Sequence, residues 1–242
     1  MRNDNHGPTP SSSDHEQLAE AHIKGIQNLS LAEQRRDQIC DAALELFLEK
    51  GFASTTIRDI CARSRVNQAS IYDYIANKND ILRRLLNKLW FRSGAPNLAD
   101  LLDDGATESF EECVSHYLRE SWTKKRKGTL LAYRSVPHML KEDRKAMRTR
   151  DETVIRELSD KLRHHSQLPD DDPRADIIAN MIIYLAGFGP MRDWLHPGVE
   201  DEVIVSTFAA GITAMIDNLS QNPLPIRAIA SDTQPPAPPL AD

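Results

Sequence analysis

The stretch from Thr55 to Lys78 constrains the fold of this 242-residue chain more than any other part of the sequence. Apolar residues recur there with helical spacing in two short runs, at Ile57, Ile60 and Cys61 and then at Ile71 and Ile75. The residues between the runs break the pattern, which predicts two short helices joined by a tight turn. Two helices of about eight residues cannot stabilise each other unaided, so supporting helices must flank them.

The sequence supplies a supporting helix on each side of this stretch. Over residues 30–50, Ser30 opens a capping-box pattern, apolar side chains follow with a helical period, and Gly51 is suited to end the helix. A second helix begins after Asn77, a good capping residue, and extends to about Phe91. Such supports allow a short polar helix to enter the major groove of DNA.

The region from about Arg35 to Leu89 resembles the N-terminal DNA-binding domain of TetR-family transcriptional regulators. The segments that carry the resemblance are AALELFLEKGF, TTIRDICARSRV, SIYDYIANK and NDILRRLL, which span three helices and both turns. The chain departs from the family pattern at three positions. Arg65 stands where the family usually has the turn glycine, Ile75 where it has an aromatic residue, and Asp73 where it often has a basic residue or histidine. A left-handed backbone at Arg65 would cost of order ~1 kcal/mol.

The resemblance implies an all-α protein with an N-terminal three-helix helix-turn-helix DNA-binding domain and a C-terminal helical bundle for ligand binding and dimerisation. We expect the DNA-binding domain to cover residues 30–78. The helical ligand-binding and dimerisation domain should cover residues 79–221, with residues 79–92 as a connecting helix. Composition predicts a disordered N-terminal extension over residues 1–29 and a disordered proline-rich tail over residues 222–242.

Helical periodicity continues through the second part of the chain. It predicts helices near residues 108–125, 129–140, 142–165, 173–195 and 200–219. A glycine- and proline-containing break at residues 187–190 should interrupt the fourth of these. The last two helices are apolar on more than one face. In the TetR family the corresponding helices pair with those of a second subunit, so the resemblance implies a homodimer that reads an inverted repeat.

Composition and charge limit the classes of function. The net charge is −6, yet residues 30–90 carry ten Lys or Arg against eight Asp or Glu, a local net of +2 that permits DNA binding. The sequence contains no run of eighteen apolar residues, so we expect no membrane span. Residues 1–20 are polar and acidic and do not resemble a secretory signal. The three scattered cysteines, Cys40, Cys61 and Cys113, favour free thiols in a reducing cytoplasm.

Several polar residues of the Thr55–Lys78 stretch are candidates for DNA contact. Gln68 is the first candidate for a base contact, because its amide can pair with adenine through two hydrogen bonds. Asn67 suits helix capping as well as base contact, and Ser70 and Asp73 share the face of Gln68. The resemblance implies contacts to the DNA backbone by Thr56, Arg58, Tyr72 and Lys78. The alternative for each residue is an ordinary solvated side chain.

Aromatic and methionine side chains of the second domain can line a ligand cavity. The candidates are Phe110, Tyr117, Trp122, Tyr133, Met181, Tyr184, Phe188 and Trp194. Periodic residues of this kind equally well form a hydrophobic core. The stretch from Leu131 to Leu158 resembles the acyl-CoA-responsive branch of the family, which would make the effector an acyl-CoA thioester or another hydrophobic ligand.

The sequence offers no support for an enzyme. It contains no glycine-rich phosphate loop, nucleophile elbow or metalloprotease motif, and the adjacent His164 and His165 diverge by about 100° on a helix. We therefore expect no cofactor and no bound metal. The prediction is a repressor that leaves a palindromic double-stranded DNA operator when a small-molecule effector binds. Two alternatives remain: a ligand-binding protein or enzyme with a non-functional DNA-binding head, and an architectural DNA protein without an effector.

Overall fold

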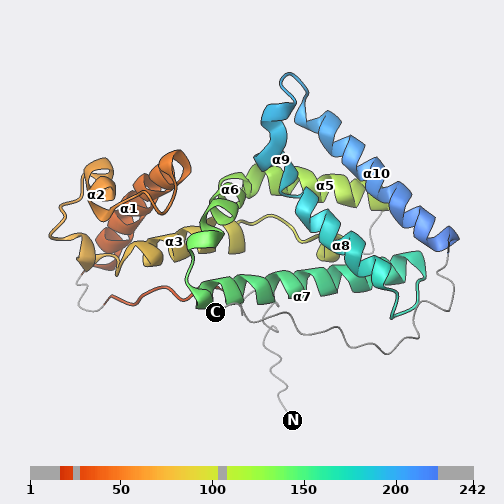
Figure 1. Ribbon diagram of the computed structural model, residues 1–242, viewed down its shortest axis with the longest axis horizontal. Helices are drawn as coiled ribbons and strands as arrows, with labels where there is room; N and C mark the ends of the chain where they lie inside the picture. Colours follow the sequence, from red (N-terminus) through yellow and green to blue (C-terminus); the bar gives the residue numbers. More distant parts are fainter. Residues whose placement is uncertain (1–16, 24–27, 103–107, 223–242) are drawn as a thin grey trace, which may run out of the picture.

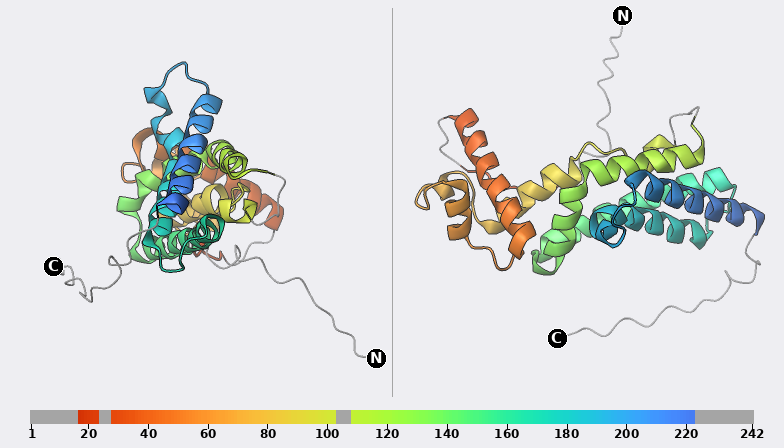
Figure 2. Two further views of the ribbon diagram at one scale, coloured as in Figure 1. Left: turned by 90° about the vertical axis from the view of Figure 1, so that its right-hand side faces the viewer. Right: turned by 90° about the horizontal axis from the view of Figure 1, so that it is seen from above.

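The computed structural model describes residues 17–23, 28–102 and 108–222, and its regular secondary structure within these ranges is entirely helical. Most of the predicted disordered extension, at residues 1–16 and 24–27, and the tail from residue 223 onward lie outside the described residues. The molecule is elongated, with α1 and α2 at one end and α5, α8 and α10 at the other (Figure 1). The right-hand view in Figure 2 shows the same separation of the small N-terminal head from the larger helical domain.

The head consists of α1 (Leu29–Lys50), α2 (Ile57–Ser64) and the start of α3 (Lys78–Leu86), as the helical periodicity predicts. These helices surround a core of fully buried side chains that includes Ile39, Phe47, Ile60, Ile71, Ile75 and Ile81. Phe47 packs edge-on against Phe52, with the ring centroids 5.1 Å apart. The core thus joins both short runs of the helix-turn-helix to the two supporting helices.

The sequence correctly predicts where α1 ends but not which residue caps its start. The helix begins at Asn28, whose Oδ1 accepts a hydrogen bond from the Leu31 N–H at 3.0 Å, rather than at the predicted capping residue Ser30. Asparagine and serine are equally good caps, so sequence preference does not decide between them. The helix ends at Gly51 as predicted, with a positive φ of 87° that favours glycine.

A continuous helical rod connects the head to the larger domain. α3 continues without a break into a wider π-helical turn, η3 (Asn87–Phe91), so the rod spans residues 78–91. Asn77 caps its first turn by accepting a hydrogen bond from the Asp80 N–H, as predicted. The rod places Leu82, Leu85 and Leu86 in the core of the head and carries Trp90 and Phe91 toward the larger domain.

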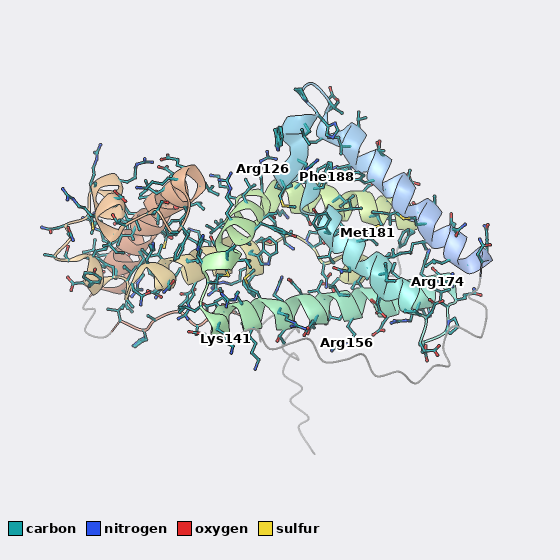
Figure 3. All side chains as sticks on the ribbon, in the orientation of Figure 1. Arg126, Lys141, Arg156, Arg174, Met181 and Phe188 are labelled. Atoms are coloured by element: carbon teal, nitrogen blue, oxygen red, sulfur yellow. The ribbon has the colours of Figure 1, made fainter. Side chains whose placement is uncertain are left out.

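The larger domain consists of five long helices: α5 (Phe110–Lys124), α6 (Arg126–Ser135), α7 (Lys141–Ser166), α8 (Pro173–Leu185) and α10 (Asp201–Gln221). The short elements are α4 (Leu98–Leu101), η4 (Val136–His138), α9 (Phe188–Arg192) and η5 (Asp193–Leu195). α10 packs along α5 and α7 packs along α8. The predicted interruption falls at Gly187, between α8 and α9. Figure 3 shows Met181 of α8 and Phe188 of α9, which both pack against the second core.

Residues 17–23 correct the prediction of a disordered N-terminal extension. They form an extended segment, here called the strap, that lies against α3 and η3. Leu18 is buried to 3% exposure in the core of the head. Composition did not predict this packing because the partners of the strap are buried polar side chains more than fifty residues away.

Candidate nucleic-acid interface and effector cavity

The turn of the helix-turn-helix depends on a left-handed arginine. Arg65 has φ 56° and ψ 25°, the conformation that the family's usual glycine adopts easily. The adjacent Ser64 carbonyl accepts a 2.6 Å hydrogen bond from the side-chain amide of Gln38 in α1. Val66, the next residue, is buried in the core of the head. Packing and the Gln38 bond therefore hold the turn in a conformation that costs a non-glycine residue free energy.

Residues 67–75, here called the recognition segment, are tighter than the predicted helix. The Asn67 side chain accepts a hydrogen bond from the Ala69 N–H at 2.9 Å, as a capping residue does. The following bonds join residues three apart, from Asp73 to Ser70 and from Tyr74 to Ile71, and η2 (Ile71–Asp73) is a 3₁₀ turn. Most residues of this segment have modest helix propensity, and so short an α-helix gains little from its own hydrogen bonds.

The recognition segment presents a polar face to solvent. Its members, here called the recognition face, are Asn67, Gln68, Ser70, Tyr72 and Asp73. All are exposed except Ser70, which is half-buried and donates a hydrogen bond to the Asn67 carbonyl. In the described ranges, the side chains of Gln68, Tyr72 and Asp73 make no hydrogen bond to the protein. Ile71 and Ile75 on the opposite side are fully buried, so the face is firmly supported.

Two predicted backbone contacts, Thr56 and Arg58, lie at the exposed start of α2. Thr56 caps α2 and shares a capping box with Asp59. The Lys50 ammonium, 2.7 Å from Asp59, lowers the pKa of that carboxyl group well below its ordinary value. Arg58 and Arg65 are exposed and have no ion-pair partner among the residues that the structure describes. These two arginines therefore leave positive charge free beside the recognition segment.

Lys78 occupies a different place from the one predicted for a phosphate contact. Its ammonium donates hydrogen bonds to the carbonyls of Phe52 and Thr55 at 2.8 Å and to that of Ala53 at 3.4 Å. It also lies 4.4 Å from the centre of the Phe52 ring, and burial lowers its pKa. Because three carbonyls engage its three donors, Lys78 stabilises the turn between α1 and α2 in this structure.

Arg36 is a structural residue that sequence reasoning missed. Its Nε donates a 2.9 Å hydrogen bond to the carbonyl of Tyr74, at the end of the recognition segment. This bond joins α1 directly to the segment that carries the recognition face. No local pattern predicts it, since the two residues are 38 positions apart.

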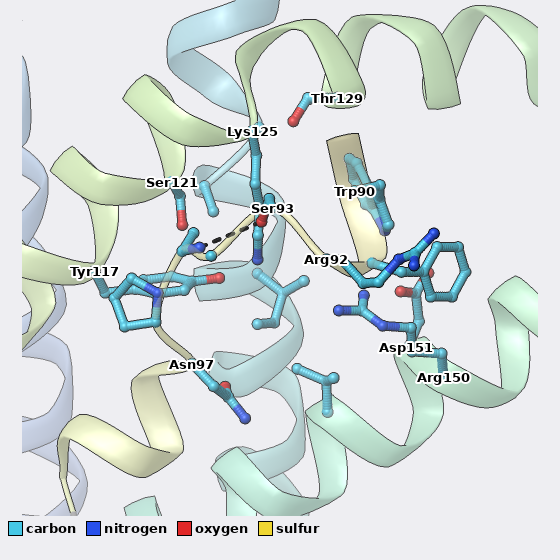
Figure 4. A pocket seen from close by; sticks show the side chains of 18 of the residues that line it. Trp90, Arg92, Ser93, Asn97, Tyr117, Ser121, Lys125, Thr129, Arg150 and Asp151 are labelled. Carbon is cyan, nitrogen blue, oxygen red and sulfur yellow. Dashed lines mark hydrogen bonds between the residues drawn. The ribbon is translucent and has the colours of Figure 1, made fainter. Parts of the chain in front are cut away.

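A cavity of about 510 Å³ lies between the rod and helices α5, α6, α7 and α8 (Figure 4). Two of the eight predicted ligand residues, Tyr117 and Tyr133, line it. Sequence reasoning missed Trp90 and Phe91 from η3, which form part of its wall, and Lys125, whose side chain points into it. The prediction treats residues 79–92 as a connecting helix and places no cavity residue in it.

The other six predicted ligand residues lie elsewhere. Phe110 stacks on His165, with ring centroids 4.7 Å apart, at the far end of the domain. Trp122 is buried and donates a hydrogen bond to the Leu185 carbonyl, and Phe188 packs edge-on against Phe208. Met181 packs against the second core, whereas Tyr184 and Trp194 are exposed at the surface. Periodicity alone does not distinguish these positions from cavity walls.

Comparison with known proteins places the head in a described family. Residues 39–85 match the family model of bacterial regulatory proteins of the tetR family. The transcriptional regulator HbdR of Aromatoleum sp. (strain CIB) is 30% identical over 145 residues, which are 56% of this chain and 59% of that protein. A transcriptional repressor of Mycobacterium tuberculosis (strain H37Rv) is 41% identical over 51 residues, 21% of this chain and 27% of that protein.

These curated relatives are matched over only part of their own length, about three fifths of the first and a quarter of the second. A solved structure extends the likeness in fold to the larger domain. The tetR-family regulatory protein from Rhodococcus RHA1 superposes with a TM-score of 0.60, covering 76% of this chain and 97% of that one at 14% identity. The head of this chain therefore matches the TetR family of bacterial regulatory proteins, and the larger domain shares the fold of a solved tetR-family protein.

Proposed function

We propose that the chain is a sequence-specific DNA-binding transcriptional regulator, a repressor that binds a palindromic double-stranded operator in the cytoplasm. The observation that supports this proposal best is the exposed recognition face above the buried Ile71 and Ile75. A polar segment on a rigid support is what a protein needs to bring side chains to base edges in the major groove. The names of the matched relatives, which describe transcriptional regulators, agree with this proposal.

We assign base contacts to the recognition face. The Gln68 amide is free to pair with adenine, and the Asp73 carboxylate can accept a hydrogen bond from the amino group of cytosine. Asn67 and Ser70 lie beside them and reach neighbouring bases or sugars. Contacts to the DNA backbone fall to Thr56, Arg58 and Tyr72, with the left-handed Arg65 beside them.

Exposed apolar faces of α8 and α10 support a homodimer. On α8, Ile177 and Tyr184 are 67% and 56% exposed. On α10, Val203 is 54% exposed, and the small residues Ala210 and Gly211 on the same side of the helix would allow a second helix to approach closely. By length and composition alone α10 would also suit a membrane span, but its other face packs along α5, as in a helical bundle. Pairing of these faces would bring two heads to successive major grooves.

The rod suggests how a small molecule changes DNA affinity. One end of the rod carries Lys78 and Leu82 in the head, and the other end places Trp90 and Phe91 in the wall of the cavity. A ligand that fits the cavity in only one position of the rod would favour one separation of the two heads. A coupling of about 1–3 kcal/mol changes DNA affinity by about 5- to 150-fold.

Electrophoretic mobility shift with DNA from upstream of the protein's own gene tests the proposal. We expect specific binding that weakens as salt increases and that unlabelled specific DNA removes more readily than random DNA. Gln68→Ala should lose about tenfold or more in affinity, because a good bidentate base contact is worth about 1–3 kcal/mol. Gln34→Ala, which changes an exposed glutamine of α1, is the matched control. Absence of binding even at low salt would favour a ligand-binding protein with a non-functional head.

A further inference from the structure

Two polar side chains of α5 and that of the residue capping its C-terminus line the cavity on one face of the helix. Tyr117, Ser121 and Lys125 are spaced four residues apart, so they lie one above another on successive turns. All three can donate a hydrogen bond, and Lys125 adds a positive charge. Figure 4 shows the Tyr117 hydroxyl and the Lys125 ammonium pointing into the cavity.

The protein leaves hydrogen-bonding capacity unused at two of these donors. The Ser121 hydroxyl belongs to a side chain of 1% exposure; it lies beside the Tyr117 hydroxyl, whose pKa it lowers, and has no other hydrogen-bond partner within the described ranges. The partly buried Lys125 ammonium has neither a hydrogen bond nor an ion pair with any residue that the structure places. Buried polar groups are nearly always paired, so unpaired donors that face a cavity point to a ligand that accepts hydrogen bonds.

Charged side chains of both signs lie along a different wall of the cavity. Asp151 and Arg150 come from α7, and the Arg150 guanidinium is 4.9 Å from the centre of the Phe91 ring. In Figure 4 these two side chains lie together, apart from Tyr117 and Ser121. The wall formed by α5 therefore carries donors and one cation, whereas the α7 wall carries charges of both signs.

The remaining walls are suited to an apolar body. Trp90, Phe91 and Tyr133 contribute aromatic rings, and Val154 and Ile183 contribute aliphatic side chains. A volume of about 510 Å³ is within the range of small-molecule sites. The cavity thus combines one polar wall with an apolar interior, which fits an amphipathic molecule with a single acidic head.

We propose that the effector is a small free carboxylic acid whose carboxylate lies on Lys125, Ser121 and Tyr117 and whose apolar body lies against Trp90 and Tyr133. This inference rests on the proposed function, because it names the ligand of the same cavity. A carboxylate has two charged acceptor oxygens for these donors, whereas the thioester carbonyl of an acyl-CoA carries no charge. A free acid therefore fits this wall better than the acyl-CoA thioester that the sequence resemblance implies.

Isothermal titration calorimetry of the full chain tests the inference. The probes are octanoate, phenylacetate and 4-phenylbutyrate, each compared with its primary amide, together with octanoyl-CoA and phenylacetyl-CoA. We expect at least one acid to bind about 10- to 100-fold more tightly than its amide, since a charged hydrogen bond to Lys125 is lost in the amide. Lys125→Met should remove this preference, whereas Lys127→Met, at an exposed lysine of α6, should retain it.

The pH dependence adds an independent readout. Burial lowers the pKa of Lys125 to about 8. The ammonium is therefore charged at pH 7 and loses its proton as the pH rises above about 8. Acid affinity should therefore remain level from pH 6 to about pH 8 and fall as the pH rises further. The other charged or titratable groups that line the cavity are Arg92, Asp100, Tyr117, Tyr133, Arg150, Asp151 and Glu157. They are unchanged in Lys125→Met, whose acid affinity should not show this fall.

The outcomes separate this inference from the proposed function. Equal binding of acids and amides, tighter binding of the thioesters than of the acids, or no binding of any acid at about 5 mM would overturn the inference. Ser121→Ala provides a second test if Lys125→Met does not fold, and it should reduce acid affinity by about 5- to 10-fold. Mobility shifts on the same preparations report DNA binding independently. Intact DNA binding without an acid preference removes only the ligand, whereas absent DNA binding removes the regulator.

Discussion

The side-chain amide of Asn87 pairs with the backbone of Leu18 in both directions. Its Oδ1 accepts a hydrogen bond from the Leu18 N–H, and its Nδ2 donates one to the Leu18 carbonyl, each 2.9 Å long. Asn87 is 1% exposed and lies between the head and the cavity end of the rod, while Gln17 lines the cavity itself. The strap therefore contacts the head, the rod and the cavity at once.

Asn87→Ala should lower the free energy of unfolding by about 1–3 kcal/mol, because the backbone groups of Leu18 then lose their buried partners. Urea unfolding monitored by circular dichroism measures this change. Asn79→Ala, in the same helix but without a side-chain partner among the described residues, is the control and should change stability by at most about 0.5 kcal/mol. Equal effects of the two variants would show that the strap does not stabilise the rod.

The left-handed Arg65 predicts opposite effects for two substitutions. Arg65→Gly should raise the free energy of unfolding by up to about 1 kcal/mol, because relief of about 1–2 kcal/mol of strain exceeds the extra freedom of the unfolded chain. Arg65→Val should lower it, since a β-branched residue at positive φ is strained. Thermal unfolding distinguishes the two. A glycine variant less stable than the valine variant would contradict the turn geometry.

Lys78 and Arg58 should separate stability from DNA binding. Lys78→Met removes the donors that three carbonyls of the turn between α1 and α2 accept from, two of them part-buried, and should lower the free energy of unfolding by about 1–3 kcal/mol. Arg58→Met changes an exposed, unpaired arginine and should leave stability within about 0.5 kcal/mol. It should instead reduce the slope of log affinity against log salt by about 1. If Lys78→Met kept normal stability but reduced the slope of log affinity against log salt, Lys78 would contact a DNA phosphate, as the sequence predicts.

The exposed face of α10 predicts the effect of a charge at the proposed dimer interface. Ala210→Arg places a long cation where the small residues should allow close approach, and it should shift the protein toward monomer. Sedimentation velocity measures the shift. Ala62→Arg, at an exposed alanine of α2, should leave the oligomeric state unchanged. A dimer that persists in Ala210→Arg would place the interface elsewhere.

Lys125 also predicts how stability without ligand depends on pH. Its pKa is about 8 in the folded protein and 10.5 in an unperturbed lysine, so the unfolded chain binds more protons between these values. The free energy of unfolding of the wild type should therefore rise relative to that of Lys125→Met as the pH increases from about 8 to about 10.5. Urea unfolding at several pH values measures this difference. A difference that falls over this range would contradict the burial of the ammonium.

Local patterns predicted much of the fold and less of the sites. Periodicity located α5, α7 and α10 to within a few residues, and Asn77 was correctly predicted as a cap because capping depends on neighbouring residues. The break at Gly187 was also predicted, since glycine and proline disfavour helices locally.

What sequence reasoning missed depends on contacts between distant segments. The roles of Arg36, Lys78 and Asn87 are set by carbonyls and backbone groups 23 to 69 positions away. The cavity wall formed by Trp90 and Lys125 exists because the rod meets α5 and α6, which no local pattern records. The 3₁₀ form of the recognition segment follows instead from its short length and modest helix propensity, which the predicted helix did not take into account.

Thiol labelling at the recognition face tests the central claim most directly, because Cys40, Cys61 and Cys113 are all buried and should react slowly. Ala69→Cys introduces an exposed thiol beside Gln68, and Gln34→Cys introduces one on the exposed side of α1. The measurement is the rate of maleimide labelling with and without the DNA fragment that the protein retards. We predict that bound DNA slows labelling of Ala69→Cys by tenfold or more and leaves Gln34→Cys unchanged. Labelling of Ala69→Cys at the same rate on saturated DNA would contradict the assignment of this face to the major groove.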